Sequence, residues 1–226
     1  MTQNKSPAVM AQRREPHDSL DDFPTPSWGT RALCEHVIGA DLCRRSAVWE
    51  PACNRGFMAR PLKEYFRWAY RSDIFDYSSQ ELKTPDYDGQ DCVHDFLFPT
   101  LPKVIEHVGV DWTISNPPFR LAEQFVMRAQ EVSRVGVAML VRTQFLESVG
   151  RYARLFSVRP PHQIAQFTER LPIVKGRIDP DISSATAYCW VIWMRGQRGT
   201  HFRWIPPCRS QLERQGDYPV SREGTR

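Results

Sequence analysis

Short apolar runs alternate with amphipathic stretches along most of this chain, and this alternation constrains the fold more than any other feature. Such alternation is typical of βαβ units, in which helices cover a mostly parallel sheet. Helical spacing, with apolar residues three to four apart, occurs at Trp28–Val37, Phe57–Phe66 and Leu121–Val132. We therefore predict an open α/β sheet. The runs expected to form strands are residues 46–50, 67–74, 90–96, 109–115, 134–141, 162–167 and 186–194.

Length and composition indicate a single domain. The chain has 226 residues, of which 41% are hydrophobic, enough to bury the core of one ordinary domain. Neither an internal repeat nor a Pro-rich linker divides it. Both ends are polar and without periodicity, so we expect a flexible tail at residues 1–20, the folded domain at residues 21–205 and a second flexible tail at residues 206–226.

The composition disfavours several functional classes. The sequence has no apolar run near the roughly 20 residues of a transmembrane helix and no secretory signal, so we expect a soluble cytoplasmic protein without a membrane partner. The net charge of +4 is compatible with a polyanionic partner without requiring one. No metal site or disulfide framework is indicated, because the cysteines are scattered without CxxC spacing: Cys34, Cys43, Cys53, Cys92, Cys189 and Cys208.

The first segment with chemical character runs from Glu50 to Met58, where a predicted strand ends and a helix begins. In an open α/β sheet, ligands bind at the carboxyl ends of the strands, and small residues let the backbone approach them. Asp73 and then Asp76 follow the next predicted strand. An acidic side chain there can accept both hydrogen bonds of a ribose diol, with Asp73 better placed. The alternative interpretation of Asp73 is a solvated residue near a helix start.

The second distinctive segment is Asn116-Pro117-Pro118-Phe119, directly after the fourth predicted strand. Consecutive prolines cannot continue a strand ladder and hold the backbone stiff, which is unusual at the end of a buried strand unless geometry matters there. Similar tetrapeptides occur by chance in unrelated proteins. The position of this one, at the sheet edge where such a fold binds its acceptor, indicates a functional role.

Together these segments resemble the adenine-type DNA methyltransferases, and the resemblance extends from about Phe23 to Arg195. The segment 50–58 resembles motif I of that family, EPAcGxGxM, while Phe23-Pro24-Thr25-Pro26 resembles its PTP element and the residues around Asp95 its DFL segment. The resemblance implies a Rossmann-like class I methyltransferase fold, α/β with a mostly parallel seven-stranded sheet and an antiparallel last strand. The motif order and short chain resemble the small adenine methyltransferases of phages and prophages.

The resemblance also implies the cofactor S-adenosyl-L-methionine (SAM) and the residues that bind it. Asn54 stands where the family has its first glycine, and asparagine is the residue other than glycine that best tolerates positive φ. Asp95 would accept a hydrogen bond from the purine amine, and Phe96 would pack on the ring. The implied cofactor-binding residues are Thr25, Glu50, Pro51, Ala52, Cys53, Asn54, Gly56, Met58, Asp73, Asp95 and Phe96.

By the same resemblance, the catalytic residues are Asn116, Pro117, Pro118 and Phe119. The adenine amine is a poor nucleophile because its lone pair is delocalised into the ring. The Asn116 side-chain oxygen and the Pro117 carbonyl would accept its two N–H groups, and Phe119 would offer a face for the extruded base. The implied reaction is methyl transfer to the N6 amine of adenine in DNA.

The residues that would bind the methyl acceptor are predicted from segments later in the chain. Arg142 and Phe145 would line the base pocket, although a surface arginine and an ordinary core phenylalanine are the alternative interpretations. Arg170, Lys175 and Arg177 lie on the long connection before the last predicted strand, where they would contact nucleic-acid phosphates. A solvated loop is the alternative there.

Two rival functions stay open at this point. The nearer is a methyltransferase acting on RNA or on a protein glutamine, because such enzymes use similar NPP-aromatic motifs. The other is a catalytically silent nucleic-acid-binding module of the same fold, which the replacement of the motif I glycine by Asn54 would allow. The recognition sequence, the strandedness of the DNA, a partner endonuclease and the oligomeric state, a homodimer included, leave no trace in the sequence.

Overall fold

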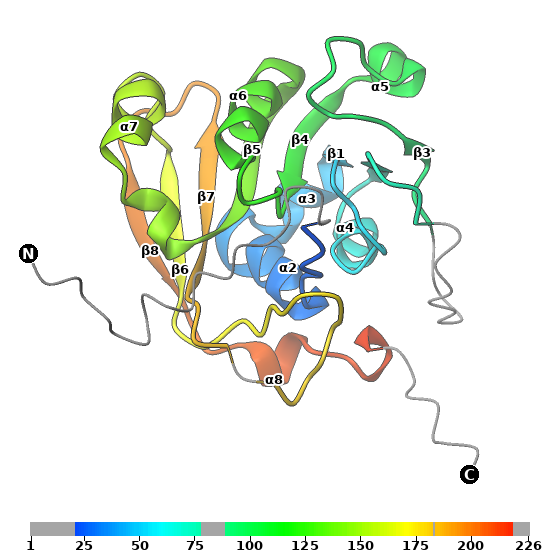
Figure 1. The fold of residues 1–226 in the computed structure, drawn as a ribbon, viewed down its shortest axis with the longest axis vertical. Helices are drawn as coiled ribbons and strands as arrows, with labels where there is room; N and C mark the ends of the chain where they lie inside the picture. The colour runs from blue at the N-terminus through cyan, green and yellow to red at the C-terminus, as the bar shows by residue number, and fades with distance from the viewer. Residues whose placement is uncertain (1–20, 78–88, 183, 219–226) are drawn as a thin grey trace, which may run out of the picture.

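The computed structural model describes residues 21–77, 89–182 and 184–218. Its centre is an eight-stranded sheet of order β3-β2-β1-β4-β5-β7-β6-β8 (Figure 1). Neighbouring strands from β3 to β5 are parallel, β7 is antiparallel to both β5 and β6, and β8 is parallel to β6. The strands are β1 (Ala47–Glu50), β2 (Trp68–Asp73), β3 (Cys92–Val93), β4 (Val110–Ser115), β5 (Ser133–Arg142), β6 (Gln163–Phe167), β7 (Tyr188–Met194) and β8 (His201–Ile205).

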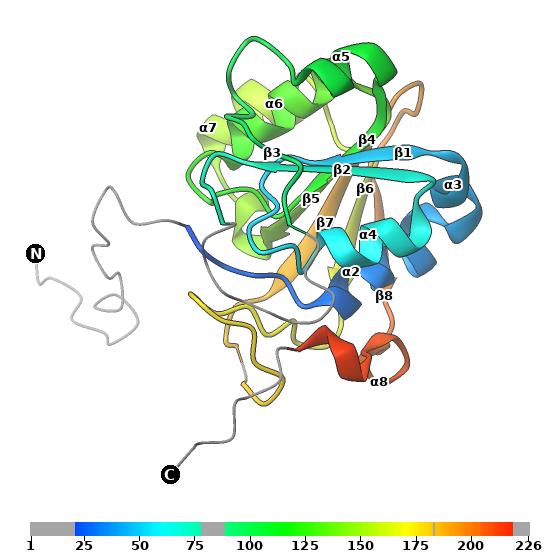
Figure 2. The same cartoon turned by 90° about the vertical axis from the view of Figure 1, so that its right-hand side faces the viewer.

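Helices cover both faces of the sheet, as the alternation of apolar runs predicts (Figure 2). Trp28 and Trp190 belong to the core cluster on one face, and Trp49 and Phe125 to the cluster on the other. No helix within the described ranges is long and apolar enough to cross a membrane. The first face carries α2 (Ser27–Leu33), η1 (Cys34–Ile38), α3 (Ala40–Arg45) and α4 (Ala59–Tyr65); the second carries α5 (Lys103–Val108), α6 (Ala122–Val132), α7 (Val149–Arg151) and η3 (Tyr152–Phe156).

The prediction of an α/β, mostly parallel sheet is confirmed, with two differences in its strands. The run predicted at 90–96 pairs only over Cys92–Val93, because the Asp95 carboxylate accepts the Leu97 N–H at 2.9 Å and turns the chain. Strand β8 was not predicted. It lies at the edge of the sheet, and its residues are exposed up to Ile205, although polar and apolar residues alternate along it.

The segment from Pro206 to Tyr218 also differs from the predicted flexible tail. It forms α8 (Arg209–Leu212) and η4 (Gln215–Asp217), and Asp217 is 3% exposed. Its carboxylate accepts two hydrogen bonds from the buried Arg31 guanidinium of α2, at 2.7 and 2.8 Å. This ion pair holds the segment against the domain. The predicted tails at residues 1–20 and 219–226 lie outside the described residues.

The order of the strands determines where a ligand can bind. Strands β1 and β4 are neighbours, and the chain proceeds outward from β1 through β2 to β3 on one side and from β4 to β5 on the other. Parallel sheets bind ligands outside the carboxyl ends of the strands at such a reversal, because the connections leave in opposite directions and open a crevice. In this chain the crevice follows Glu50 of β1 and Ser115 of β4.

Candidate cofactor and acceptor site

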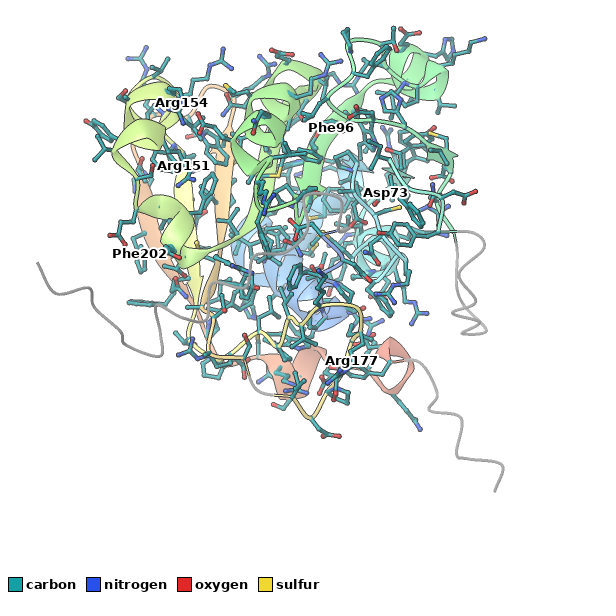
Figure 3. The ribbon with its side chains drawn as sticks, in the orientation of Figure 1. Asp73, Phe96, Arg151, Arg154, Arg177 and Phe202 are labelled. Atoms are coloured by element: carbon teal, nitrogen blue, oxygen red, sulfur yellow. The ribbon has the colours of Figure 1, made fainter. Side chains whose placement is uncertain are left out.

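A cleft lies at this reversal, between the turn after β1, the end of β2 and the segment after β4. Every residue predicted to bind the cofactor except Gly56 lines it. Figure 3 shows two of them, Asp73 from β2 and Phe96 from the segment after β3. Of the catalytic tetrapeptide, Asn116 and Pro118 contribute to the lining. Lining residues that the sequence did not single out include Asp21, Phe57, Ile74, Tyr77, Leu121 and Phe125.

The turn after β1 keeps a glycine-like shape although Asn54 replaces glycine. Asn54 has φ 50°, the single positive φ outside glycine among the described residues, and Gly56 has φ 85°. The backbone N–H of Asn54 donates to Asp73 at 2.8 Å, and that of Phe75 donates to the other Asp73 oxygen at 3.0 Å. The Asp73 carboxylate therefore ties the end of β2 to the turn, and each oxygen retains acceptor capacity toward the cleft.

The cleft is acidic. Glu50 and Asp73 are 2% and 7% exposed, and Asp21 and Asp95 add two further carboxylates to the lining. Burial, assisted by the charge of Asp73 and opposed by Arg71, raises the pKa of Glu50. Burial likewise raises the pKa of Asp73 against its backbone hydrogen bonds. None of the described residues that line the cleft is Lys or Arg, so it favours a cationic ligand over a phosphate.

Asn116 presents a fixed acceptor. Its side-chain Nδ2 donates to the Phe23 carbonyl at 2.9 Å and to Thr25 Oγ1 at 3.1 Å. The Phe23 carbonyl can only accept, so these contacts determine which end of the amide is the nitrogen. Asn116 Oδ1 is buried and has no partner within the described part of the chain. An unsatisfied buried acceptor is costly, which makes this oxygen a candidate for hydrogen bonding to a ligand.

Phe119 is held beside the cleft by contacts on several sides. Its backbone N–H donates to Asp21 Oδ2 at 2.5 Å. Its ring lies 4.9 Å from that of Phe23, and the Arg142 guanidinium carbon lies 3.9 Å from its centroid. Arg142 thus contacts the NPPF segment directly, at a cation–π distance. The Pro117 side chain is buried.

Arg142 and the other residues predicted to bind the acceptor do not line the cleft. Phe145 is 8% exposed in the core, with Arg151 4.0 Å from its ring centroid, as the ordinary-core interpretation expects. Arg170 donates to the Ala185 carbonyl at 3.1 Å. Arg177 pairs with Asp179 at 3.3 Å and lies on the connection between β6 and β7, apart from Asp73 and Phe96 (Figure 3). Lys175 lies on the same connection.

Asp22 and Arg55 were not predicted by the sequence, yet they join the cofactor turn to this connection. Arg55 Nη2 donates to both oxygens of Asp22, at 2.7 and 3.0 Å, and Arg55 Nη1 donates to the Gly176 carbonyl at 3.1 Å. No sequence spacing indicates this pair, because the three segments lie far apart in the chain.

The sheet order and the position of the cleft are those of the Rossmann-like class I SAM-dependent methyltransferase fold. Solved structures similar to it include a proposed class I methyltransferase of this type from Listeria monocytogenes, with TM-score 0.55 and 15% identity over 83% of this chain and 67% of that one. A proposed RNA methyltransferase from Pyrococcus horikoshii has TM-score 0.54 and 15% identity over 83% and 94% of the two chains. A proposed O-methyltransferase from Agrobacterium tumefaciens has TM-score 0.52 and 15% identity over 87% and 99%.

No protein-family model and no curated protein matches the sequence. At 15% identity, the structural similarities establish the fold and leave the reaction and substrate to be argued from the site.

Proposed function

We propose that this protein is a SAM-dependent methyltransferase that methylates the N6 amine of adenine in DNA. The observation that carries the proposal is Asn116, whose buried Oδ1 has no partner among the described residues while Phe23 and Thr25 hold its Nδ2. A fixed acceptor at the carboxyl end of β4, beside the cofactor cleft, suits an amine substrate that must be oriented by its N–H groups.

The charge of the cleft fits SAM. SAM carries a sulfonium and an ammonium group, and the acidic lining matches them, whereas it would repel nucleotides that carry a phosphate chain. The residues of the turn that line the cleft, among them Glu50, Cys53 and Met58, would hold the methionine part together with Thr25. Asp73 would accept from the ribose diol, and Asp95 and Phe96 would bind the adenine of the cofactor.

The residues of this chain would mainly orient the acceptor and exclude water. Asn116 Oδ1 and the Pro117 carbonyl would accept the two N–H groups of the target amine and favour pyramidal nitrogen, in which the lone pair is available. SAM supplies an electrophilic methyl group with its own leaving group. The nitrogen becomes cationic as the methyl group transfers, so it loses its proton readily and needs no strong base.

A target adenine must leave the base stack to reach Asn116. Phe119 follows this residue closely, and its position is held by Asp21, Phe23 and Arg142. Arg142 covers the ring at 3.9 Å, so an extruded base would stack on a different part of the ring or against Arg142 itself.

A nucleic-acid substrate agrees with the charge of the acceptor half. Residues 142–205 contain ten Lys and Arg against four Asp and Glu, a net +6 in a chain whose total is +4. Such an excess attracts a phosphate backbone. We favour DNA because the motifs resemble the adenine-type DNA methyltransferases. RNA is the second candidate, because the similar fold from Pyrococcus horikoshii is described as an RNA methyltransferase.

The deciding experiment incubates the purified protein with methyl-labelled SAM and separate pools of double-stranded DNA, single-stranded DNA, RNA and protein. We expect label in N6-methyladenine from DNA. Label only in RNA or in glutamine would move the function to the rival methyltransferases. An absence of label, together with an absence of SAM binding by calorimetry, would identify the silent module.

A further inference from the structure

The cofactor turn and the β6–β7 connection meet at one small cluster of polar residues. Asp22 precedes the PTP element, Asn54 and Arg55 belong to the turn after β1, and Gly176 lies on the connection that carries Lys175 and Arg177. Asn54 Nδ2 donates to Asp22 Oδ1 at 2.8 Å, and Arg55 donates to both Asp22 oxygens. The Asp22 carboxylate therefore bonds to the turn, and Arg55 joins the turn to the connection.

The connection is attached to this cluster at two points through its backbone. The Gly176 N–H donates to the Asp22 carbonyl at 2.8 Å, and the Gly176 carbonyl accepts from Arg55 at 3.1 Å. Gly176 has φ 78°, a conformation that other residues rarely adopt. Arg55 is 9% exposed, so its bonds to Asp22 are largely shielded from water.

The side chain of Asn54 orients Arg55 within the turn. Asn54 Oδ1 accepts from the backbone N–H of Arg55 at 2.6 Å and from Arg55 Nε at 3.0 Å, which orients the guanidinium toward Asp22. Meanwhile the Asn54 backbone N–H is bonded to Asp73, the proposed ribose-binding residue. Asn54 thus contacts Asp73 directly and is linked to the connection through Arg55.

We propose that Asp22 and Arg55 are positioning residues that couple cofactor binding to nucleic-acid binding; the identity of both ligands rests on the proposed function. A cofactor that orders Asn54 and Asp73 also orders Arg55 and, through it, the connection with Lys175 and Arg177. The nucleic acid then meets a connection that is already held in place. Because coupling free energies are reciprocal, each ligand strengthens the binding of the other by the same factor.

Arg55→Met tests this coupling, since methionine keeps a long unbranched side chain and lacks the guanidinium group that bonds to Asp22 and Gly176. Neither Arg55 nor Asp22 belongs to the residues lining the cleft. The matched control is Arg134→Met, which breaks the pair with Asp111 at 3.1 Å near the amino ends of β4 and β5. Binding of a fluorescent adenine-containing DNA oligonucleotide is measured by anisotropy with and without S-adenosylhomocysteine, and S-adenosylhomocysteine binding alone is measured by calorimetry.

In the unmodified protein and in Arg134→Met, we expect S-adenosylhomocysteine to tighten oligonucleotide binding by about 5- to 150-fold, the usual range of allosteric coupling. In Arg55→Met this factor should approach one, while S-adenosylhomocysteine binding alone stays within about threefold of that of the unmodified protein.

A thermal melt verifies folding, and Asp22→Asn provides a second variant of similar shape with the same expected loss of coupling. An Arg55→Met protein that keeps the full factor would overturn the coupling. If both ligands bind the unmodified protein independently, the coupling alone fails; if S-adenosylhomocysteine does not bind, the proposed function fails with it.

Discussion

The proposed cofactor side and the proposed acceptor side of this molecule differ in charge, in enclosure and in how their residues come together. The cofactor cleft is lined by four carboxylates, two of them on the buried side chains Glu50 and Asp73. The acceptor half, residues 142–205, carries a net +6, and its predicted substrate residues lie outside the cleft lining. A compact cationic ligand and an extended polyanion impose opposite requirements. The first needs a converging, enclosed site, and the second needs a broad basic surface.

Asn116 lies at the junction of the two sides. It lines the cofactor cleft, and its Nδ2 is held by the segment that contains Phe23 and Thr25. Phe119, three residues later, contacts Arg142 of the acceptor half. Substitutions on the cofactor side, at the junction and on the acceptor side should therefore give separate kinetic signatures.

The largest effect is expected from Asn116→Ala. Removal of one preorganised hydrogen-bonding group from an active site commonly lowers kcat by about 10²- to 10³-fold. We expect a loss of this size in single-turnover methylation, with SAM affinity by calorimetry nearly unchanged. Retained turnover would refute the role of Asn116 as the amine acceptor.

Asn116→Asp is the matched control for that substitution. It keeps an acceptor oxygen in place and removes the Nδ2 donor to the Phe23 carbonyl and Thr25. If the acceptor matters most, Asn116→Asp should retain more activity than Asn116→Ala. Equal losses would instead assign the residue to positioning of the PTP element.

A second, smaller effect is expected at Asp73, on the cofactor side only. Hydrogen bonds to charged groups contribute about 1.5–3 kcal/mol, which corresponds to roughly 10- to 150-fold in affinity. Asp73→Ala should weaken SAM binding by this amount and spare turnover at saturating SAM.

Burial raises the pKa of Asp73, so SAM affinity should begin to fall on acidification at a higher pH than an exposed aspartate would give. Asp76→Ala is the control; a loss there and none at Asp73 would transfer the ribose-binding role to Asp76.

The third prediction concerns the acceptor side only. Alanine substitution of Arg170, Lys175 and Arg177 should weaken DNA binding equally for all sequences and reduce the slope of log affinity against log salt by about one for each phosphate that is no longer neutralised. A matched triple at Arg44, Arg45 and Arg67, near the amino ends of β1 and β2, should leave the slope unchanged. An unchanged slope in the first triple would support the solvated-loop interpretation.

The two sides also differ in how far the sequence predicts them. The cofactor turn is local: Glu50 and Asp73 end consecutive strands, Asn54 follows the first of them, and a parallel sheet brings the ends of such strands to one edge. The acceptor side depends on packing between distant segments, such as Arg142 on Phe119 and Asp22 on Arg55, and no pattern of hydrophobicity encodes those contacts. Strand β8 was also missed, although polar and apolar residues alternate along it, and its pairing with β6 again joins segments distant in the sequence.

The smallest effect is expected from substitution of Glu50 in the cofactor cleft, where the effect on protein stability can be separated from the effect on SAM binding. Its Oε2 has no partner among the described residues, and burial raises its pKa above the value in the unfolded chain. The neutral form therefore stabilises the folded state. This contribution is complete below the unfolded pKa and is lost as the pH rises through the folded pKa.

Glu50→Gln should remove this pH-dependent loss while weakening the binding of a cationic cofactor. Each unit by which folding raises a pKa corresponds to about 1.4 kcal/mol, and each kcal/mol corresponds to about 2–4 °C in Tm for a domain of this size. In thermal melts, the Tm of Glu50→Gln should lie a few degrees above that of the unmodified protein at pH 8, and the two Tm values should be equal near pH 4.5. Calorimetry should show weaker SAM binding by the variant at pH 8. The exposed Glu106→Gln should change neither quantity. A Glu50→Gln protein with unchanged SAM affinity would mean that the buried carboxylate has no role in cofactor binding. The charge contrast between the two sides would then rest on Asp21, Asp73 and Asp95.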